Sequence, residues 1–442
     1  MSDNTPSRGG VAGWTPARMR ALFRSQRPRA RRLRARLAIL TGAVAIGLAA
    51  TLFAAAADAC GALFKELARA HRWAPLATTP LTFAVLVWLT RRYVPLARGS
   101  GIPQVMAAQA DPEAARTSLV SVPTVIGKAV LTLAAVLAGA SVGREGPTVQ
   151  IAAAVMGVTH RILRVPLRAG VLIAGGAAGV AAAFNTPLAG LLFAIEELAS
   201  AYEQKVTLLV IAAIVIAGMI AQSVQGDYLY FGLVGAHMPI GSGLVVAGVA
   251  GVVGGLSGGA FARVMLALSG TAHPLAAWSK RRPVLFAAAC GVIVAALGCS
   301  TGLTWGTGYS AARAMIGGVD APLWFGPAKM LATLATAVAG LPGGIFAPSL
   351  AVGAGIGNLL RPIFSGSPAS AVVILGMVGY FAGVVRAPLT AVIILAETTG
   401  SRGLMLPMFA TAFVADGASQ LVCREKLYHG LARTFAMTPR DK

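Results

Sequence analysis

Three glycine-rich segments interrupt an otherwise apolar chain: Gly99-Ser-Gly-Ile-Pro103, Gly143-Arg-Glu-Gly-Pro147 and Gly344-Ile-Phe-Ala-Pro348. Each segment leads into an apolar stretch that predicts a helix, and its proline stands near the first helical turn, where a missing N–H group costs little. Backbone that leaves the helical conformation at membrane depth must be buried in protein or line a water-filled cavity. The three segments therefore predict an all-α membrane protein whose broken helices surround a polar pathway.

The composition around these segments is that of a polytopic membrane protein. The 442 residues are 56% hydrophobic and 12% charged, whereas a soluble globular chain carries about 25% charged residues. Apolar runs recur from residue 37 almost to the C-terminus, and a run of ~20 residues is enough to cross a bilayer. This pattern excludes a soluble enzyme, a disordered scaffold and a disulfide-rich secreted domain.

The positive charge is concentrated at the two ends of the chain. Residues 1–36 contain ten arginines and one acid, and residues 424–442 are also basic. Basic flanks mark the cytoplasmic side of a membrane, so we expect both termini inside the cell. The short tail and the arginine-rich start look prokaryotic, which would place the protein in the plasma (inner) membrane. The first block predicts an arm on the anionic headgroups of the lipid bilayer. A nucleic-acid partner is not expected, because no recognition module accompanies the arginines.

From this distribution we expect a basic arm over 1–36, a transmembrane domain over 37–436 and a short tail over 437–442.

Within the transmembrane domain, the sequence repeats itself. Within the domain, residue 143 aligns with residue 344, a shift of 201 residues that recurs elsewhere. The matched pairs are Gly143 and Gly344, Gly175 and Gly376, Pro187 and Pro388, and Glu196 and Glu397. Duplicated halves (roughly 37–224 and 241–436) with matching broken helices indicate a transport site at their interface; the alignment leaves open whether the halves are parallel or inverted.

The apolar pattern also predicts where the helices lie. The expected segments are 37–70, 76–92, 119–140, 148–163, 169–184, 187–201, 206–224, 241–268, 283–299, 321–340, 347–361, 369–384, 388–398, 403–421 and 427–436. Many of them are shorter than a full membrane span. Such short helices fit a domain in which the chain turns back inside the bilayer.

Helix N-termini at the three glycine-rich breaks would attract an anion. The first turn of a helix has unsatisfied N–H groups and roughly half a positive charge, and glycine lets a ligand approach that backbone closely. Because no fixed lysine or arginine charge is needed, the anion would not be held too tightly to leave. The pattern therefore predicts an anion pathway; a cation pathway would favour rings of carboxylates or carbonyls.

These segments, together with Lys426-Leu-Tyr428-His-Gly-Leu-Ala-Arg433, resemble the selectivity filter and last helix of the CLC family of chloride channels and proton/chloride exchangers. The resemblance covers roughly residues 37–436. It implies an inverted-repeat fold with broken, tilted helices, and a homodimer in which each subunit has its own ion pathway. The short tail resembles prokaryotic members without CBS domains. The resemblance implies no enzymatic activity and no cofactor, because chloride and protons are the transported ions.

The resemblance assigns a role to each motif. The residues of the implied selectivity filter are Gly99, Ser100, Gly101, Ile102, Pro103, Gly143, Arg144, Glu145, Gly146, Pro147, Gly344, Ile345, Phe346, Ala347 and Pro348. A central chloride would bind the hydroxyls of Ser100 and Tyr428 and the N–H groups of Ile345 and Phe346. Nitrate-preferring members often carry proline at the position of Ser100, so serine favours chloride. Without this context, Ser100 would be a local turn or cap hydroxyl and Tyr428 an interfacial aromatic residue.

Two glutamates would couple chloride to protons. Glu145, at the mouth of a helix N-terminus, would occupy an anion position when charged and swing away when protonated. The structural alternative is a helix cap or a partner of Arg144, but an ionisable group at membrane depth is a functional candidate by default. Glu197 matches the internal proton-transfer residue of the family's exchangers. Taken alone, Glu197 would be an ordinary carboxylate at a helix end.

These residues favour a secondary-active proton/chloride antiporter, and the alternative is a passive chloride channel on the same fold. An intramembrane enzyme and a transporter of organic anions fit less well, because the chain offers no nucleophile–base set and no arginine clamp beyond Arg144. Lys128 could add positive potential to the pathway or extend its ammonium group to the membrane surface. The repeat-related Glu196 and Glu397 suggest a shared structural task, such as capping a neighbouring helix.

Overall fold

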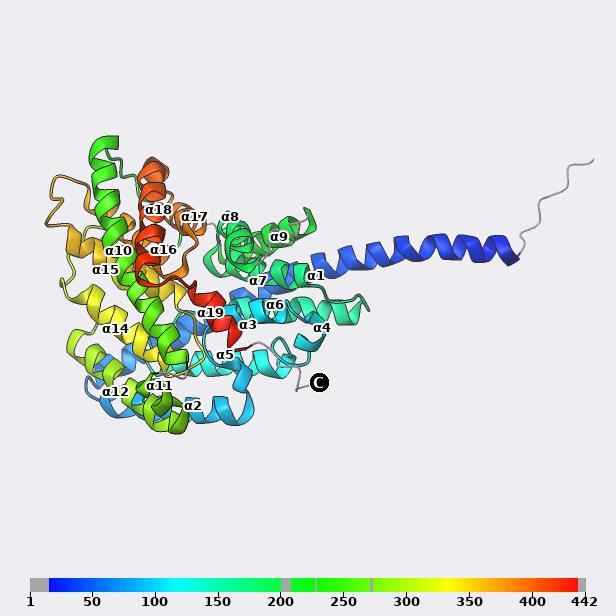
Figure 1. The fold of residues 1–442 in the computed structure, drawn as a ribbon, viewed down its shortest axis with the longest axis horizontal. Helices are drawn as coiled ribbons and strands as arrows, with labels where there is room; N and C mark the ends of the chain where they lie inside the picture. Colours follow the sequence, from blue (N-terminus) through cyan, green and yellow to red (C-terminus); the bar gives the residue numbers. More distant parts are fainter. Residues whose placement is uncertain (1–15, 200–207, 227–228, 271–272, 436–442) are drawn as a thin grey trace, which may run out of the picture.

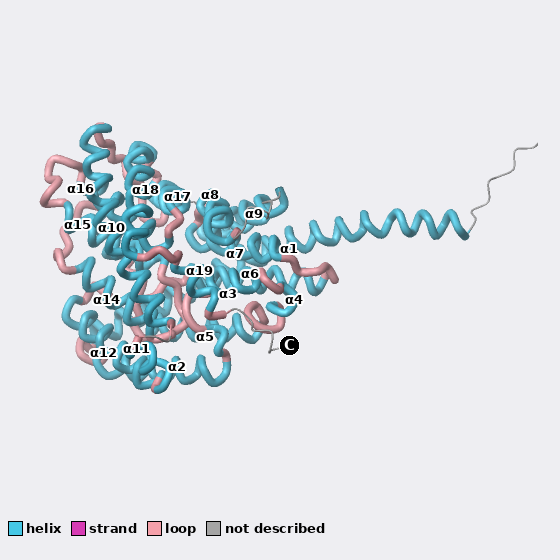
Figure 2. The backbone as a smooth tube through the Cα atoms, in the orientation of Figure 1, coloured by secondary structure: helices cyan, strands magenta, loops and turns pink. Residues whose placement is uncertain are grey.

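The computed structural model describes residues 16–199, 208–226, 229–270 and 273–435, and over residues 16–30 it describes the backbone alone. The described residues form helices joined by loops, with two isolated β-bridges and no longer strand (Figures 1 and 2). The first half contains α1 (Pro16–Ala70), α2 (Pro75–Tyr93), α3 (Ile102–Ala108), α4 (Pro112–Ala115), α5 (Val122–Leu137), α6 (Glu145–Ile162), α7 (Ala169–Phe184), α8 (Pro187–Phe193) and α9 (Leu208–Gln225). The second half contains α10 (Ile240–Ser269), α11 (Pro274–Arg281), α12 (Pro283–Thr301), α13 (Tyr309–Ile316), α14 (Phe325–Val338), α15 (Phe346–Leu360), α16 (Ala369–Val385), α17 (Pro388–Thr399), α18 (Met405–Val422) and α19 (Leu427–Arg433). Three short turns complete the list: the 3₁₀ turns η1 (Pro95–Ala97) and η3 (Arg402–Leu404) and the π-helical turn η2 (Ala194–Leu198).

The all-α architecture is as predicted. Among the described residues, five helical stretches are long and apolar enough to cross a membrane. They are Leu208–Gln225, Ile240–Ser269, Pro283–Thr301, the stretch Arg31–Ala70 of α1, and Arg402–Val422. Several others, such as α15 and α16, are apolar but shorter. Their ends therefore lie inside the protein, where the polar backbone groups of a helix terminus need partners.

The structure corrects some predicted boundaries. α1 begins at Pro16 rather than at residue 37, so part of the expected arm continues the first membrane helix and projects from the body (Figure 1). The helix expected over 119–140 is shorter, because Ser121 caps its start by accepting a hydrogen bond from the Thr124 amide, and Gly139 after its end has a φ of +76°.

The segment expected as one helix over 187–201 is α8 followed by the π-helical turn η2. The helix expected after the first glycine-rich segment is α3. The short helices α4, α11 and α13 were not predicted, because so few turns show no apolar period. Residues 1–15 of the expected arm, the tail over 437–442 and the predicted helix ends at 200–201, 206–207 and 436 lie outside the described residues.

The two halves meet around a pseudo-two-fold axis at the repeat-related Gly143 and Gly344. The amide of each glycine donates to the carbonyl of the other, and both N···O distances are 2.7 Å. The same relation holds at two helix ends, where Asn185 and Arg386 adopt left-handed conformations with φ of +59° and +60°. Identical conformations and reciprocal bonds at a shift of 201 residues are what a duplicated chain with two-fold symmetry produces.

The helix pair α8 and α17 repeats this symmetry and confirms the predicted capping role. Glu196 follows α8 and accepts hydrogen bonds from the amides of Leu389 and Thr390 at the start of α17, at 3.0 and 2.6 Å. Glu397, near the end of α17, accepts from the amides of Leu188 and Ala189 at the start of α8, at 3.2 and 2.8 Å. Each helix thus neutralises the positive N-terminus of the other.

The short helices reach their positions because small residues let backbones touch. Gly353 and Gly357 of α15 lie against the backbone of α16 at Met377 and Val373, where a β-carbon would collide. Gly179 of α7 lies in the same way against the backbone of α6. Small residues at membrane helix contacts allow this close packing, which fixes the N-termini of α6 and α15 at the centre of the molecule.

Candidate functional site

The N-termini of α6 and α15 carry the second and third glycine-rich motifs and lie side by side. α6 starts at Glu145 after Arg144, and α15 starts at Phe346 after Ile345. The Gly143–Gly344 pairing described above joins the two loops just before these starts. Both helices therefore present unsatisfied first-turn N–H groups to one region, which favours negative charge there.

The first motif closes this region from the other direction. A β-carbon on Gly146 would fall on the Ser100 hydroxyl, and a β-carbon on Gly344 would meet the backbone of Gly146. Gly99 is bridged to Pro342, just ahead of the third motif. The structure thus brings the three predicted segments into direct contact, and only glycine leaves enough room for them.

The Ser100 loop is held in place by two buried polar side chains. Lys128 is fully buried, and its Nζ donates to the carbonyls of Ala97 and Gly99 at 2.8 and 2.6 Å. Gln104 donates to the Arg98 carbonyl at 2.6 Å and accepts from the Gly101 amide at 3.1 Å. Lys128 therefore does not extend to the membrane surface; it fixes the backbone on both sides of the loop that carries Ser100.

Ser100 and Tyr428 present hydroxyls that the described part of the chain leaves without a hydrogen-bond partner. Ser100 is 8% exposed and Tyr428 is fully buried. The Tyr428 ring lies 5.8 Å from the ring of Phe346, which also packs on Phe184, Phe193 and Phe381. Buried hydroxyls are almost always hydrogen-bonded, so a site with two free hydroxyls beside a helix N-terminus has capacity for a bound anion.

Glu145 lies fully buried at the α6 N-terminus. Its two carboxylate oxygens have no hydrogen-bond partner among the described residues. The carboxylate occupies the space that a β-carbon on Gly143 would need, next to the ring of Pro348. It does not pair with Arg144, whose guanidinium turns instead to Asp58 at 2.6 Å and to the Ala54 carbonyl at 2.8 Å. Within the described chain, the carboxylate is therefore paired with no cationic side chain.

Glu197 lies on the π-helical turn η2 and is fully buried. Its carboxylate is 3.8 Å from Lys426 Nζ and 3.5 Å from His429 Nδ1, and these two side chains are about one-third exposed. Both partners belong to the segment around α19 that carries Tyr428 between them. The turn thus places a buried acid behind Tyr428 and connects it to solvent through two basic groups.

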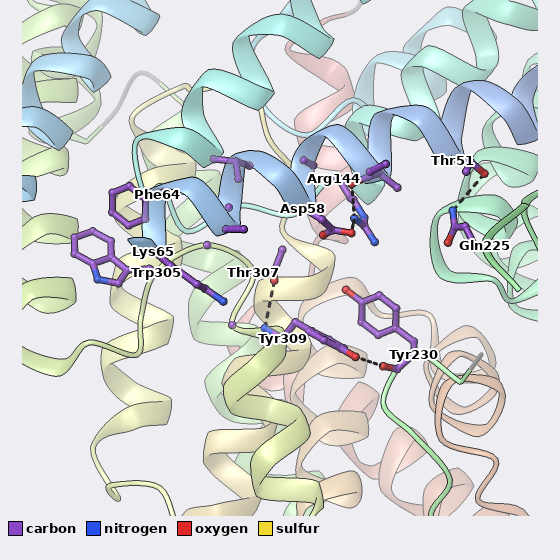
Figure 3. A pocket seen from close by; sticks show the side chains of 18 residues that line it. Thr51, Asp58, Phe64, Lys65, Arg144, Gln225, Tyr230, Trp305, Thr307 and Tyr309 are labelled. Atoms are coloured by element: carbon purple, nitrogen blue, oxygen red, sulfur yellow. Dashed lines mark hydrogen bonds and ion pairs between the residues drawn. The ribbon is translucent and has the colours of Figure 1, made fainter. Parts of the chain in front are cut away.

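A cavity of about 610 Å³ leads to Arg144 from one side of the molecule (Figure 3). We call it the Asp58 cavity; Asp58, Lys65, Thr307 and Tyr309 are among its lining residues. Figure 3 shows the Asp58–Arg144 pair on one wall, facing Thr307 and Tyr309 on the other. Arg144 is one of its lining residues, and the fully buried Glu145 is the next residue in the chain.

A second cavity of about 410 Å³ reaches Ser100, and we call it the Arg98 cavity. Arg91, Arg98 and Lys280 contribute positive charge to its lining, and no acid belongs to that lining. Arg98 lies 4.8 Å over the ring of Phe435, at the end of the described chain. A cavity with a positively charged lining raises the local concentration of anions. Ser100 lies in this lining, between the Arg98 cavity and the N-termini of α6 and α15.

Two positions here were not predicted from the sequence. Asp58 stands within an apolar stretch, and nothing in the sequence connects it to Arg144. Lys329 is fully buried in α14 and donates to the carbonyls of Thr304 and Gly306. The repeat could have revealed Lys329, because a shift of 201 residues carries Lys128 onto it.

The fold and the site define a polytopic membrane protein with an anion-attracting centre between two cavities. A family model described as voltage gated chloride channel matches residues 81–420, more than half of the chain. The chain therefore belongs to the voltage-gated chloride channel (CLC) family, which confirms the resemblance of its motifs.

Solved structures share this fold at low sequence identity. A slow cyanobacterial Cl⁻/H⁺ antiporter is 23% identical, with a TM-score of 0.79, and the match covers 92% of this chain and 99% of that one. A CLC-type fluoride/proton antiporter is 20% identical, with a TM-score of 0.75 and coverage of 95% and 99%. A eukaryotic CLC transporter is 20% identical, with a TM-score of 0.72 and coverage of 91% and 75%. These likenesses confirm the inverted-repeat CLC-type fold.

Proposed function

We propose that the protein is a secondary-active antiporter that exchanges chloride for protons. Chloride binds between the hydroxyls of Ser100 and Tyr428 and the N–H groups of Ile345 and Phe346. The free, buried hydroxyls and the N-terminus of α15 support this site. Partial charges of helix ends hold a dehydrated anion less tightly than a full cation would, so the ion can also leave.

The observation that carries the proposal is the buried Glu145 carboxylate, which has no hydrogen-bond partner in the described residues. A charged carboxylate at a helix N-terminus competes with chloride for the same N–H groups. A protonated carboxyl loses this attraction and moves aside. Because Glu145 follows Arg144 at the end of the Asp58 cavity, the same side chain takes a proton from that cavity and admits an anion.

Glu197 provides the other end of the proton route. A buried acid without hydrogen-bond partners in the described chain has little structural value. Lys426 and His429 lead from it to solvent. Protons would therefore pass between solvent and Glu197 on the side of the Arg98 cavity, apart from the chloride that passes Ser100.

The arginines at the start of α1 indicate the sides of the membrane. Ten of them precede residue 37, and such clusters stay in the cytoplasm. The stretch from Thr51 to Lys65 at the other end of α1 lines the Asp58 cavity, which is therefore external. We accordingly place both termini in the cytoplasm and the protein in the plasma membrane. From the resemblance to the family we also propose a homodimer, which chemical cross-linking in native membranes tests.

Flux through reconstituted protein tests the exchange. Vesicles with a chloride gradient should move protons against their own gradient. Glu197→Gln should abolish proton movement and keep chloride flux, and Glu145→Gln should make chloride flux insensitive to pH. Glu66→Gln, an exposed acid on α1, is the control and should behave like wild type. Normal coupling in both of the first two variants would refute the assigned roles.

The alternative function is a passive chloride channel on the same fold. It differs from the exchanger in one measurable property, the absence of proton movement while chloride flux is intact. Glu197 argues against it, because a channel has no use for a buried acid connected to the cytoplasm.

A further inference from the structure

The second half of the chain contains a loop built like the Ser100 loop. Gly306 and Gly308 have φ of +59° and +77° and precede α13, as Gly99 and Gly101, with φ of +68° and +115°, precede α3. Each loop is also held by a buried lysine, and the two lysines are related by the 201-residue repeat. The second loop has no place in the function proposed above.

Lys329 holds this second loop through three hydrogen bonds. Its Nζ donates to the carbonyl of Thr304 at 2.8 Å, the carbonyl of Gly306 at 2.6 Å and the hydroxyl of Ser141 at 2.8 Å. Lys329 is fully buried, and no carboxylate in the described part of the chain forms an ion pair with it. An ammonium group has three protons to donate, so three acceptors offset the cost of burying its charge.

These three acceptors lie on two segments of the chain that each contribute residues to the lining of the external cavity. Trp305, Thr307 and Tyr309 of the loop line the Asp58 cavity. Figure 3 shows Thr307 and Tyr309 opposite the Asp58–Arg144 pair, and Trp305 beside Phe64. Ser141 stands three residues before Arg144 on the segment that leads into α6. Ser141 is fixed in turn by hydrogen bonds with Thr333 and Thr336 of α14, at 2.8 and 3.2 Å.

We propose that Lys329 is a positioning residue that sets the shape of the external entrance to Glu145. Its ammonium group joins the loop around Gly306 to the segment around Ser141, so the gap between the two walls beside Arg144 depends on it. Lys128 holds the backbone of the Ser100 loop at the internal entrance, through the carbonyls of Ala97 and Gly99. The repeat has thus supplied one clamp for each entrance, and this inference rests on the anion pathway proposed above.

Chloride dependence measured separately from each side tests the two clamps. Right-side-out and inside-out vesicles from cells that express the full chain present one face each. Lys329→Met keeps an unbranched side chain that is one atom shorter and removes the charge, so the buried acceptors must rearrange. We expect the external chloride concentration at half-maximal flux to change about tenfold, the effect of losing roughly one charged hydrogen bond, with the internal value unchanged. Lys128→Met is the matched control and should change the internal value alone.

Conservative variants separate positioning from general damage. Lys329→Arg keeps the charge and should restore much of the external affinity, and Ser141→Ala should give a smaller shift on the same side. If Lys329→Met does not fold, Ser141→Ala alone decides the sidedness. Equal shifts on both sides, or a shift confined to the internal side, would overturn the inference. The readout follows chloride alone, so a wild-type protein without proton coupling would refute the exchanger and still permit this test.

Discussion

Replacing Glu196 with glutamine should destabilise the protein more than the same change at Glu397. Glu196 accepts three hydrogen bonds, from the Leu389 amide, the Thr390 amide and the Thr390 hydroxyl, and Glu397 accepts two. Glutamine keeps one acceptor oxygen and replaces the other by an NH2 group, which cannot accept, so each variant loses one amide hydrogen bond outright, worth about 2 kcal/mol. Each bond that remains loses about 1 kcal/mol with the charge, because a hydrogen bond to a charged group is worth ~1.5–3 kcal/mol and a neutral one ~0.5–1.5 kcal/mol. The expected losses are about 4 kcal/mol for Glu196→Gln, which keeps two bonds, and about 3 kcal/mol for Glu397→Gln, which keeps one.

Thermal inactivation in detergent measures this difference. An unfolding entropy of ~2.1 cal/mol/K per residue, the scale of soluble proteins, gives about 0.9 kcal/mol/K for the 442-residue chain. The apparent midpoints should therefore fall by about 4 °C for Glu196→Gln and about 3 °C for Glu397→Gln. The fraction that elutes as a single species after a fixed heating time is the readout, because membrane proteins often unfold irreversibly. Glu66→Gln should leave the midpoint unchanged.

The double variant tests whether the two carboxylates act as a unit. Both hold the same pair of helices, α8 and α17, so loss of one contact loosens the other. The double loss should be smaller than the sum of the single losses by at least ~0.5 kcal/mol, the lower limit for coupled neighbours. A larger fall for Glu397→Gln than for Glu196→Gln would refute the reasoning. So would strict additivity.

Two further predictions concern the ion pathway. Ser100→Pro should shift the anion preference from chloride to nitrate, because proline has no hydroxyl and is the residue common at this position in nitrate-preferring members of the family. Isotopic flux with both anions measures this preference, and unchanged selectivity would exclude Ser100 from the site. Asp58→Asn should move the pH of half-maximal flux a few tenths of a unit toward acid, because Arg144 without its exposed partner favours charged Glu145; the size follows from a surface ion pair of ~0.2–1 kcal/mol. A shift toward alkaline pH would contradict this use of the Arg144–Asp58 pair.

The sequence was sufficient to predict the contact of the three motifs, because each break had to be buried and each carried the glycines that close approach requires. It was sufficient for the reciprocal caps as well, since Glu196 and Glu397 stand at the same place in the two halves. The environment of Glu197 was beyond prediction. A π-helical turn has no sequence signature of its own, and its orientation depends on contacts with α19, far along the chain.

Side-chain partners were the other limit. The sequence suggests that Arg144 could pair with its neighbour Glu145. In the structure, Arg144 pairs with Asp58, which lies on α1. Such a pairing depends on how α1 crosses α6, and apolar periodicity does not encode that crossing. The sequence also left two possibilities for Lys128, a charge beside the ion pathway or an ammonium group at the membrane surface. Lys128 is buried because the loop before Ser100 lies against it, and the sequence does not show the position of that loop.

The reciprocal bonds between Gly143 and Gly344 have a consequence for the transport cycle. They lie on the symmetry axis, at the base of both motif helices, so any rocking of one half over the other would shear them. We therefore expect the backbone at Gly143 and Gly344 to keep its position during the cycle. For the exchange proposed above, we therefore expect access from the two faces of the bilayer to alternate through movements of individual side chains.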